Sequence, residues 1–262
     1  CAVNLAHSTQ VTYQKILENH ILPALGKVKL TDLTHRQVQQ FVTSLSVKKK
    51  LSAKTVRNIH GILHNMLESA IRDELLLRNV SERCSLPRVT QHQGRAITTA
   101  KLNQFLRAID GKQFRNIFFI DIFSGLRLSE ILGLRWEDVD FDHDCIYVRQ
   151  QLHQKQVKGD FGYFLAPPKE GKQRKVILAQ NAMRVLWHQR AKQNEQQLAA
   201  GALWDNSFHL VFTNDFGQPL NRRTVYKHLK RILLDCGMGN YTFHSLRHSF
   251  ATISLENGDD IK

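Results

Sequence analysis

Two stretches decide how this chain is organised: Ser124-Gly125-Leu126-Arg127-Leu128-Ser129-Glu130 in the middle, and Thr242-Phe243-His244-Ser245-Leu246-Arg247-His248 further on. His244 and Arg247 are three apart at the start of a predicted helix, so both project from one face. A guanidinium offers a planar fork of donors to two phosphate oxygens, and an imidazole can donate to a phosphate or move a proton near neutrality. Arg127, His244 and Arg247 together predict a clamp for a phosphodiester.

Simpler explanations exist for each of these residues. His244 could cap its helix, and Arg247 could form a surface ion pair. Glu130, at i+3 from Arg127, could orient that guanidinium or form an ordinary intrahelical pair with it. A bare His-x-x-Arg pattern would favour the simpler explanations, but the two longer strings favour the phosphate site.

Composition points to a nucleic-acid partner. The chain has 262 residues, of which 42% are hydrophobic, enough for two modest domains or one large one. Lysine and arginine number 37 against 23 aspartates and glutamates, and the pI is about 9.8, so the potential suits a polyanion. The basic excess is densest in residues 1–95.

The first segment predicts three helices. Ser8 or Thr9 would cap the first, which Pro23 and Gly26 would end. Thr34 and Gln37 match a capping box for the second helix. Ser52 would cap the third, whose apolar stripe is Val56, Ile59, Ile62, Leu63, Met66, Leu67 and Ala70.

The remainder predicts a mixed region after a linker at residues 86–97. Apolar periodicity predicts helices around residues 102–109, 114–123, 127–134, 181–196, 222–234 and 244–256. Strands are predicted at 145–149, 161–166 and 174–178, which would together form one small antiparallel sheet. The fold class is therefore mainly α with a small antiparallel β-sheet.

Several other kinds of site are disfavoured. Cys1, Cys84, Cys145 and Cys236 are too widely spaced to suggest a zinc site or a disulfide framework. The alternating Asp138, Asp140, Asp142 and Asp144 lack the glycine and glutamate of a calcium loop, which favours a solvated turn. His60 and His64 favour packing over metal binding. With no apolar run near 20 residues and no signal peptide, we expect a cytoplasmic protein.

Both quoted strings, extended to Asp140 and Thr252, closely resemble the two signature boxes of the tyrosine recombinases, the phage integrase family. The resemblance implies a two-domain DNA clamp: a helical core-binding domain at residues 1–85, the linker at 86–97, and an α+β catalytic domain at 98–262. It further implies site-specific recombination of a prophage or mobile element in a bacterium, in association with the nucleoid.

Carried over residue by residue, the resemblance makes Arg127, His244 and Arg247 catalytic, Glu130 the support of the first arginine, and His248 a packing or supporting residue. Lys169 resembles the lysine that protonates the leaving sugar oxygen, with Lys172 as a competitor. The predicted DNA-binding residues are Lys48, Lys49, Lys50, Lys54, Arg57, Lys172, Arg174, Arg223, Lys227 and Arg231. No metal or other cofactor is expected.

The implied reaction is attack of a tyrosine hydroxyl on a DNA phosphodiester, which gives a 3′-phosphotyrosine and a free 5′-hydroxyl. The family pattern places that tyrosine after the second arginine, preceded by a histidine or tryptophan. Tyr13, Tyr147, Tyr163, Tyr226 and Tyr241 all precede Arg247, and none suits the role. We therefore expect a C-terminally incomplete catalytic domain that binds DNA without cleaving it.

The resemblance also bears on partners. Double-stranded DNA is the expected partner, with a tetramer on paired sites for the full-length protein, a monomer for this fragment, and accessory DNA-bending proteins. Two alternatives stay open: a catalytically inactive DNA-binding remnant of an integrase, and a DNA-relaxing enzyme like a type IB topoisomerase.

Overall fold

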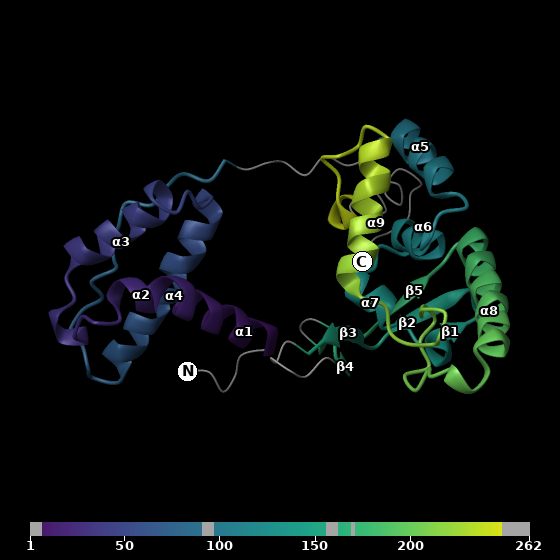
Figure 1. Ribbon diagram of the computed structural model, residues 1–262, viewed down its shortest axis with the longest axis horizontal. Helices are drawn as coiled ribbons and strands as arrows, with labels where there is room; N and C mark the ends of the chain where they lie inside the picture. Colours follow the sequence, from purple (N-terminus) through teal and green to yellow (C-terminus); the bar gives the residue numbers. More distant parts are fainter. Residues whose placement is uncertain (1–6, 91–96, 156–161, 169–170, 248–262) are drawn as a thin grey trace. The chain divides into compact units, whose positions relative to one another are not determined.

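The computed structural model describes residues 7–90, 97–155, 162–168 and 171–247 (Figure 1). Contacts divide the chain into two compact units, residues 1–92 and 93–262. Each unit has its own apolar core. Lys169, His248 and the end of the helix predicted at 244–256 lie outside the described residues.

The described part of the first unit is helical. It contains α1 (His7–Ile16), a π-helical turn (Leu17–Ile21), α2 (Leu22–Leu25), a short 3-10 turn (Leu30–Asp32), α3 (His35–Val47) and α4 (Ala53–Arg72). The predicted caps of the last two helices are confirmed, because Thr34 and Gln37 bond reciprocally and Ser52 accepts from the Thr55 N–H. The apolar stripe of α4 is buried apart from Met66.

The predicted start of the first helix is wrong, and its predicted end is confirmed at Gly26 but not at Pro23. The helix already includes His7, so neither Ser8 nor Thr9 caps it. Pro23 lies at the start of α2 and does not end the helical run, which continues to Gly26. Proline has no N–H for a carbonyl one turn back. The chain adapts with the π-helical turn, and the Asn19 carbonyl accepts instead from Lys49 Nζ at 3.1 Å.

A buried polar cluster holds the segment after α4, and we call it the 79–81 cluster. Asn79 Nδ2 donates to Glu68 Oε1 at 2.6 Å, while Asn79 Oδ1 accepts from the backbone N–H and hydroxyl of Ser81. His60 Nε2 donates to the Ser81 carbonyl, and His64 Nδ1 lies 3.1 Å from the Ser81 hydroxyl. The two histidines therefore anchor a loop, in agreement with the packing role predicted for them.

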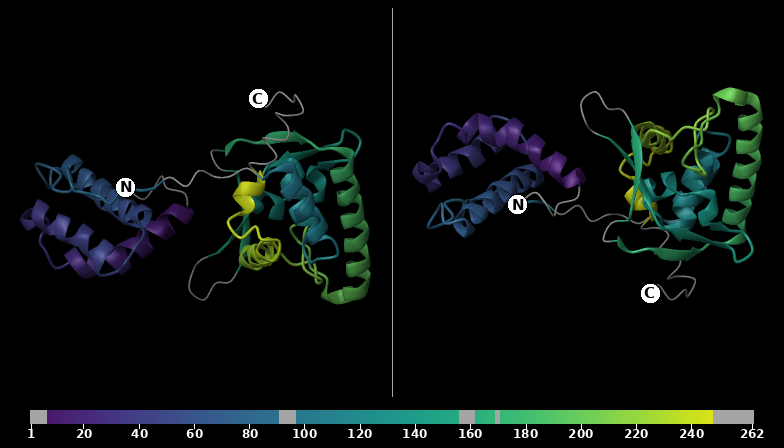
Figure 2. Two further views of the ribbon diagram at one scale, coloured as in Figure 1. Left: turned by 90° about the horizontal axis from the view of Figure 1, so that it is seen from above. Right: turned by 90° about the horizontal axis from the view of Figure 1, so that it is seen from below.

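The helices of the second unit pack against one another. This unit contains α5 (Thr99–Ile109), α6 (Arg115–Ser124), α7 (Leu128–Leu132), α8 (Gln180–Ala200) and α9 (Arg222–Asp235), two 3-10 turns (Trp136–Asp138 and Gly201–Leu203) and a helical turn at residues 243–247. α6 packs against α8, α7 and α5, and α9 packs against α7 and α5. In both views of Figure 2, α8 forms one side of this unit. No helix in the described part of the chain is long and apolar enough to span a membrane.

Two small antiparallel sheets replace the single predicted sheet. β1 (Val139–Asp140), β2 (Cys145–Val148) and β5 (Arg174–Ile177) form one, in the order β1-β2-β5. β4 (Tyr163–Ala166) pairs instead with β3 (Gln151–Gln154). The prediction that β2, β4 and β5 share a sheet is therefore wrong. β3 follows β2 after only two residues and takes β4 as its partner.

Candidate functional site

The first arginine stands at the entrance to α7. Arg127 has extended backbone and is the residue before the first turn of that helix. The Glu130 carboxylate accepts from the Arg127 backbone N–H at 3.0 Å and from Arg127 Nη1 at 2.8 Å. One carboxylate thus both completes the helix start and fixes the guanidinium. The orienting interpretation of the i+3 spacing and the intrahelical-pair interpretation describe the same contact.

Glu130 also binds a second arginine. Arg174, on β5, donates to Glu130 Oε2 at 2.6 Å and to Oε1 at 3.3 Å. Burial alone would raise the pKa of Glu130, but the hydrogen bonds from Arg174 and Arg127 outweigh it and hold that pKa below its ordinary value. The carboxylate stays ionised at neutral pH and ties β5 to the start of α7.

The far end of α7 is pressed against β3. Gly133 ends the helix, and a Cβ added there would lie 2.7 Å from the Leu152 backbone nitrogen and 2.9 Å from the Gln151 carbonyl carbon. Only glycine allows that close backbone approach. The helix that carries Glu130 is therefore fixed at both ends.

The second string forms the start of another helix. Residues 243–247 are helical, and Thr242 and Ser245 bond reciprocally, each side chain accepting from the other's backbone N–H. Thr242 is thus the cap, and His244 does not cap the helix. Leu246 and Phe243 are buried in the core of the unit, while His244 and Arg247 are three apart and line a pocket.

The two strings meet at one pocket of about 380 Å³ in the second unit. Its lining contains the three predicted catalytic residues that the structure describes, Arg127, His244 and Arg247. The other lining residues are Asp121, Leu126, Leu128, Ser129, Arg222, Tyr226, Thr242 and Phe243. Residues 117 or more positions apart in sequence are thereby brought to one concave site.

The pocket carries excess positive charge. Arg127, Arg174 and Arg247 interact electrostatically, and Glu130 is bonded to the first two. Burial, followed by the charge of Arg127, lowers the pKa of Arg247, although an arginine remains protonated at any working pH. A site with unbalanced guanidinium charge in a partly buried hollow is suited to an anion.

Most predicted DNA-binding residues are exposed. Lys48, Lys49, Lys50, Lys54 and Arg57 are exposed on the first unit, and Lys172, Arg223, Lys227 and Arg231 are exposed on the second. Three of the ten already have protein partners. Lys49 binds the Asn19 carbonyl, Arg57 donates to the Pro87 carbonyl, and Arg174 binds Glu130. The structure thus places Arg174 beside the predicted catalytic residues.

Three pocket residues lie outside the two strings and were not predicted from the sequence as site residues: Asp121, Arg222 and Tyr226. Arg222 and Tyr226 are four apart on α9, a spacing that puts them on one helix face. The Tyr226 ring stacks against Phe243, with ring centroids 6.2 Å apart. Asp121 stands in an apolar run, where no periodicity could show which wall it faces.

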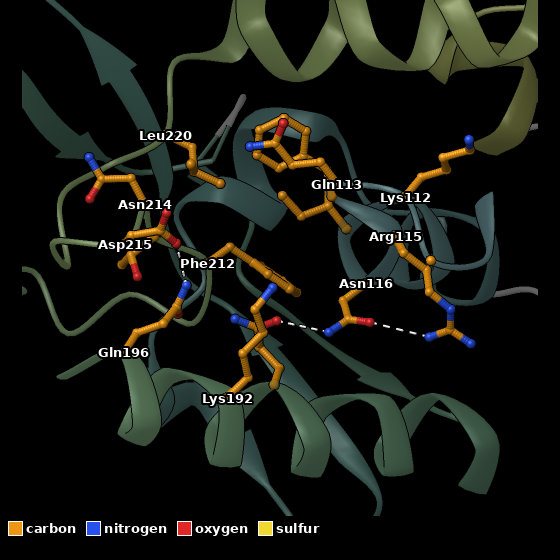
Figure 3. A pocket seen from close by; sticks show the side chains of 15 residues that line it. Lys112, Gln113, Arg115, Asn116, Lys192, Gln196, Phe212, Asn214, Asp215 and Leu220 are labelled. Carbon is orange, nitrogen blue, oxygen red and sulfur yellow. Dashed lines mark hydrogen bonds between the residues drawn. The ribbon is translucent and has the colours of Figure 1, made fainter. Parts of the chain in front are cut away.

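A larger hollow of about 590 Å³ lies elsewhere in the second unit, between the start of α6 and α8 (Figure 3). Several of its polar groups are paired with each other: Asn116 bonds Gln189 and Arg115, and Gln196 bonds Asp215. None of the predicted site residues lines it. Size alone therefore does not identify the functional pocket.

The aspartate series before β2 forms a turn. Asp140 accepts from the backbone of Asp142 and His143, as expected for a turn. Asp138 departs from the predicted solvated turn, because it is buried and binds Arg149 and Gln150. In the described ranges, no group of three or more His, Cys, Asp or Glu side chains is placed to hold a metal ion.

Both units contain residues that match models of known protein families. Residues 90–262 match the Phage integrase family, and residues 1–46 match its N-terminal SAM-like domain. A tyrosine recombinase XerC-like protein of Caldanaerobacter subterraneus subsp. tengcongensis is 25% identical, over 97% of this chain and 69% of its own. The ICEBs1 integrase of Bacillus subtilis is 22% identical, over 99% and 70%.

Two solved structures share the fold. The Tn1549 transposon integrase in complex with transposon right end DNA superposes with a TM-score of 0.82 at 19% identity, covering 98% of this chain and 84% of that chain. A lambda integrase tetramer bound to a Holliday junction gives a TM-score of 0.68 at 16% identity, covering 97% and 66%. The mainly helical fold with small antiparallel sheets is that of the integrases.

Proposed function

The chain belongs to the phage integrase family, and we propose from this premise that its pocket binds the phosphodiester at which a DNA strand is exchanged. One observation carries the proposal: Arg127, His244 and Arg247, from two distant strings, line a single pocket with unbalanced positive charge. The two guanidiniums would bind the nonbridging oxygens and stabilise the charge that builds up on them in the transition state.

The remaining roles follow from the surroundings of each residue. Glu130 and Arg174 would hold Arg127 in position, and His244 would donate to the phosphate or move a proton. Lys169 is proposed as the group that protonates the leaving sugar oxygen, with Lys172 as its competitor. Residues 1–85 would be the core-binding domain, 86–97 the linker, and 98–262 the catalytic domain.

The duplex would be gripped through its backbone. The exposed basic residues of α4 and α9, including Lys54, Lys227 and Arg231, are suited to phosphate contacts, and such contacts are insensitive to sequence and weaken with salt. The Tn1549 integrase was solved in complex with transposon right end DNA, and the lambda integrase as a tetramer bound to a Holliday junction. We extend DNA binding to this chain, and a tetramer on paired sites to the complete recombination complex.

No tyrosine within residues 1–262 is proposed as the nucleophile. Tyr226 is the tyrosine that lines the pocket, but its ring stacks on Phe243 and its helix belongs to the proposed DNA surface. Tyr241 is buried, and Lys101 Nζ lies 3.5 Å from its hydroxyl. Residues 1–262 should therefore bind DNA without forming a covalent bond to it.

The test uses a nicked duplex, which traps a covalent intermediate if one forms. Arg127→Ala and Arg247→Ala should each weaken binding at least about tenfold, since each removes a charge-assisted bond to phosphate. Arg184→Ala, an exposed arginine on α8, is the matched control and should bind normally. Equal binding by all variants would refute the phosphate pocket. A covalent adduct that disappears in Tyr226→Phe would refute the assignment of the tyrosines.

A further inference from the structure

Asp121 is a buried carboxyl group that the proposed chemistry does not use. It lies on α6, six residues before Arg127, and is 1% exposed. Neither carboxyl oxygen has a hydrogen-bond partner within the described part of the chain. An unpaired buried carboxylate is strongly disfavoured. Burial accordingly raises the pKa of Asp121 well above its ordinary value, and the nearby charge of Arg247 only partly opposes this rise.

The pocket joins Asp121 to Arg247, since both side chains line it. Arg247 is repelled by the charges of Arg127 and Arg174 and attracted by those of Glu130 and Asp121. Glu130 already accepts from two other arginines. The Arg247 guanidinium therefore has two possible anionic partners: the carboxylate of Asp121 at the buried wall and a phosphate bound in the pocket.

Other titratable or charged groups also face this place. From α9 and the two strings, the lining includes Arg222, Tyr226, Arg127 and His244, and Glu130 of α7 acts on Arg247. α5 and α8 also pack against α6, but among the described residues they add none to the lining. Asp121 is the carboxyl group of this lining, and burial raises its pKa well above its ordinary value.

We propose that Asp121 is a positioning residue for Arg247: when ionised, it draws the guanidinium towards the buried wall, and when protonated, it leaves the guanidinium to the phosphate. This inference rests on the proposed phosphate-binding role of Arg247. A bound phosphate and an ionised Asp121 compete for one guanidinium, so binding of DNA takes up a proton at Asp121. The affinity for DNA then falls as the pH rises.

The experiment measures proton uptake when residues 1–262 bind a short duplex of fixed sequence. Calorimetric titrations between pH 6 and pH 9, in two buffers of different ionisation enthalpy, give the number of protons. Between the pKa values of Asp121 in the free and the DNA-bound chain, the wild-type chain should take up as much as one proton more than Asp121→Asn and lose up to about tenfold in affinity per pH unit. Every other titratable group is the same in both proteins, so the difference isolates Asp121.

Three further variants separate the possible outcomes. Asp121→Leu should behave like Asp121→Asn, which guards against an effect of the amide alone. In an Arg247→Gln background, Asp121→Asn should no longer change binding, because the residue acts through Arg247. Thermal unfolding shows that each variant is folded.

Equal proton uptake by wild type and Asp121→Asn would overturn the inference while leaving the phosphate pocket in place. So would an effect of Asp121→Asn that persists in the Arg247→Gln background. If Arg247→Gln alone leaves affinity unchanged, the proposed function fails, and the inference fails with it.

Discussion

The two units both bury polar groups, but they differ in how completely those groups are hydrogen-bonded within the protein. In the 79–81 cluster of the first unit, the Asn79 and Ser81 side chains are almost completely buried and satisfy one another, with Glu68 and two histidines around them. In the second unit, Glu130 binds two arginines, while Asp121 lies near a third arginine, Arg247, and neither of its carboxyl oxygens has a hydrogen-bond partner within the described part of the chain. We call the 79–81 cluster a closed network, because its buried groups are hydrogen-bonded to one another, and the Glu130 and Asp121 region an open network, because Asp121 is not.

The difference indicates what each network is for. A fully satisfied buried network fixes a backbone segment and has no need of a ligand. An open network with excess positive charge is poorly suited to stability, but it can bind an anion strongly. Four changes test this contrast, and they are given from the largest expected effect to the smallest.

Glu130→Gln should cause the largest loss of stability, about 2–3 kcal/mol. It leaves two guanidiniums without their shared charge, although both are partly exposed, which reduces the loss below that of a fully buried pair. Urea unfolding of residues 1–262 gives the value. Glu137→Gln removes an exposed partner of Arg135 and should cost less than about 1 kcal/mol. Equal losses from the two changes would mean that the bonds of Glu130 contribute no more to the free energy of unfolding than an exposed ion pair does.

Asn79→Ala should cost about 2 kcal/mol, because it removes bonds to Glu68 and Ser81 and leaves buried groups unpaired. DNA binding at a temperature where the chain remains folded should hardly change, since the closed network has no ligand. The exposed Asn58→Ala on α4 is the control and should stay within about 0.5 kcal/mol. A large loss of DNA affinity in Asn79→Ala would contradict a purely structural role.

The two buried carboxyls should show opposite dependence of stability on pH. The pKa of Glu130 is lowered on folding, so its contribution is present above its ordinary value of 4.5 and is lost as the pH falls through the folded value. The pKa of Asp121 is raised, so folding is favoured at low pH, and stability falls as the pH rises from 3.8 through the folded value.

Asp121→Asn should therefore become more stable than wild type as the pH rises, by up to about 1.4 kcal/mol for each pH unit between the unfolded and folded pKa values. Unfolding midpoints measured from pH 4 to pH 9 check the sign. A difference that does not change with pH would mean that Asp121 keeps its charge in both states.

Lys54→Ala should have the smallest effect: a few-fold loss of DNA affinity and a salt slope reduced by about 1, as for one lost phosphate contact. Stability should be unchanged, because the side chain is exposed on α4. Fluorescence anisotropy at several salt concentrations gives both numbers, with Arg184→Ala on α8 as the reference. An unchanged slope would remove α4 from the proposed DNA surface.

The sequence predicted best where a local rule decides the structure. The caps at Thr34 and Ser52 and the apolar stripe of α4 depend only on neighbours in sequence, and they are confirmed. The prediction that Pro23 ends the helix was wrong because the effect of this proline depends on Lys49, 26 positions away, which binds the Asn19 carbonyl. β3 was missed because its four residues, Gln151–Gln154, have a single buried apolar side chain and show no strand pattern.

The candidate site was predictable in its residue types and only partly in its arrangement. The chemistry of guanidinium and imidazole indicated a phosphate clamp from Arg127, His244 and Arg247, and these residues share a pocket. The bond between Glu130 and Arg174 joins a helix to a strand 44 residues later, and no spacing rule encodes such a contact. Asp121 lies within an apolar run, and likewise no spacing rule shows that its side chain lines the pocket.

Gly133 limits how this protein could diverge. Its Cα hydrogen faces the backbone of Gln151 and Leu152, so any side chain there would displace α7 from β3. A mutation at this position touches no charge, no pocket wall and no predicted DNA contact, yet it would shift the helix that carries Glu130. A single added methyl group, outside the pocket lining, would therefore be enough to disturb the contact between Glu130 and Arg127.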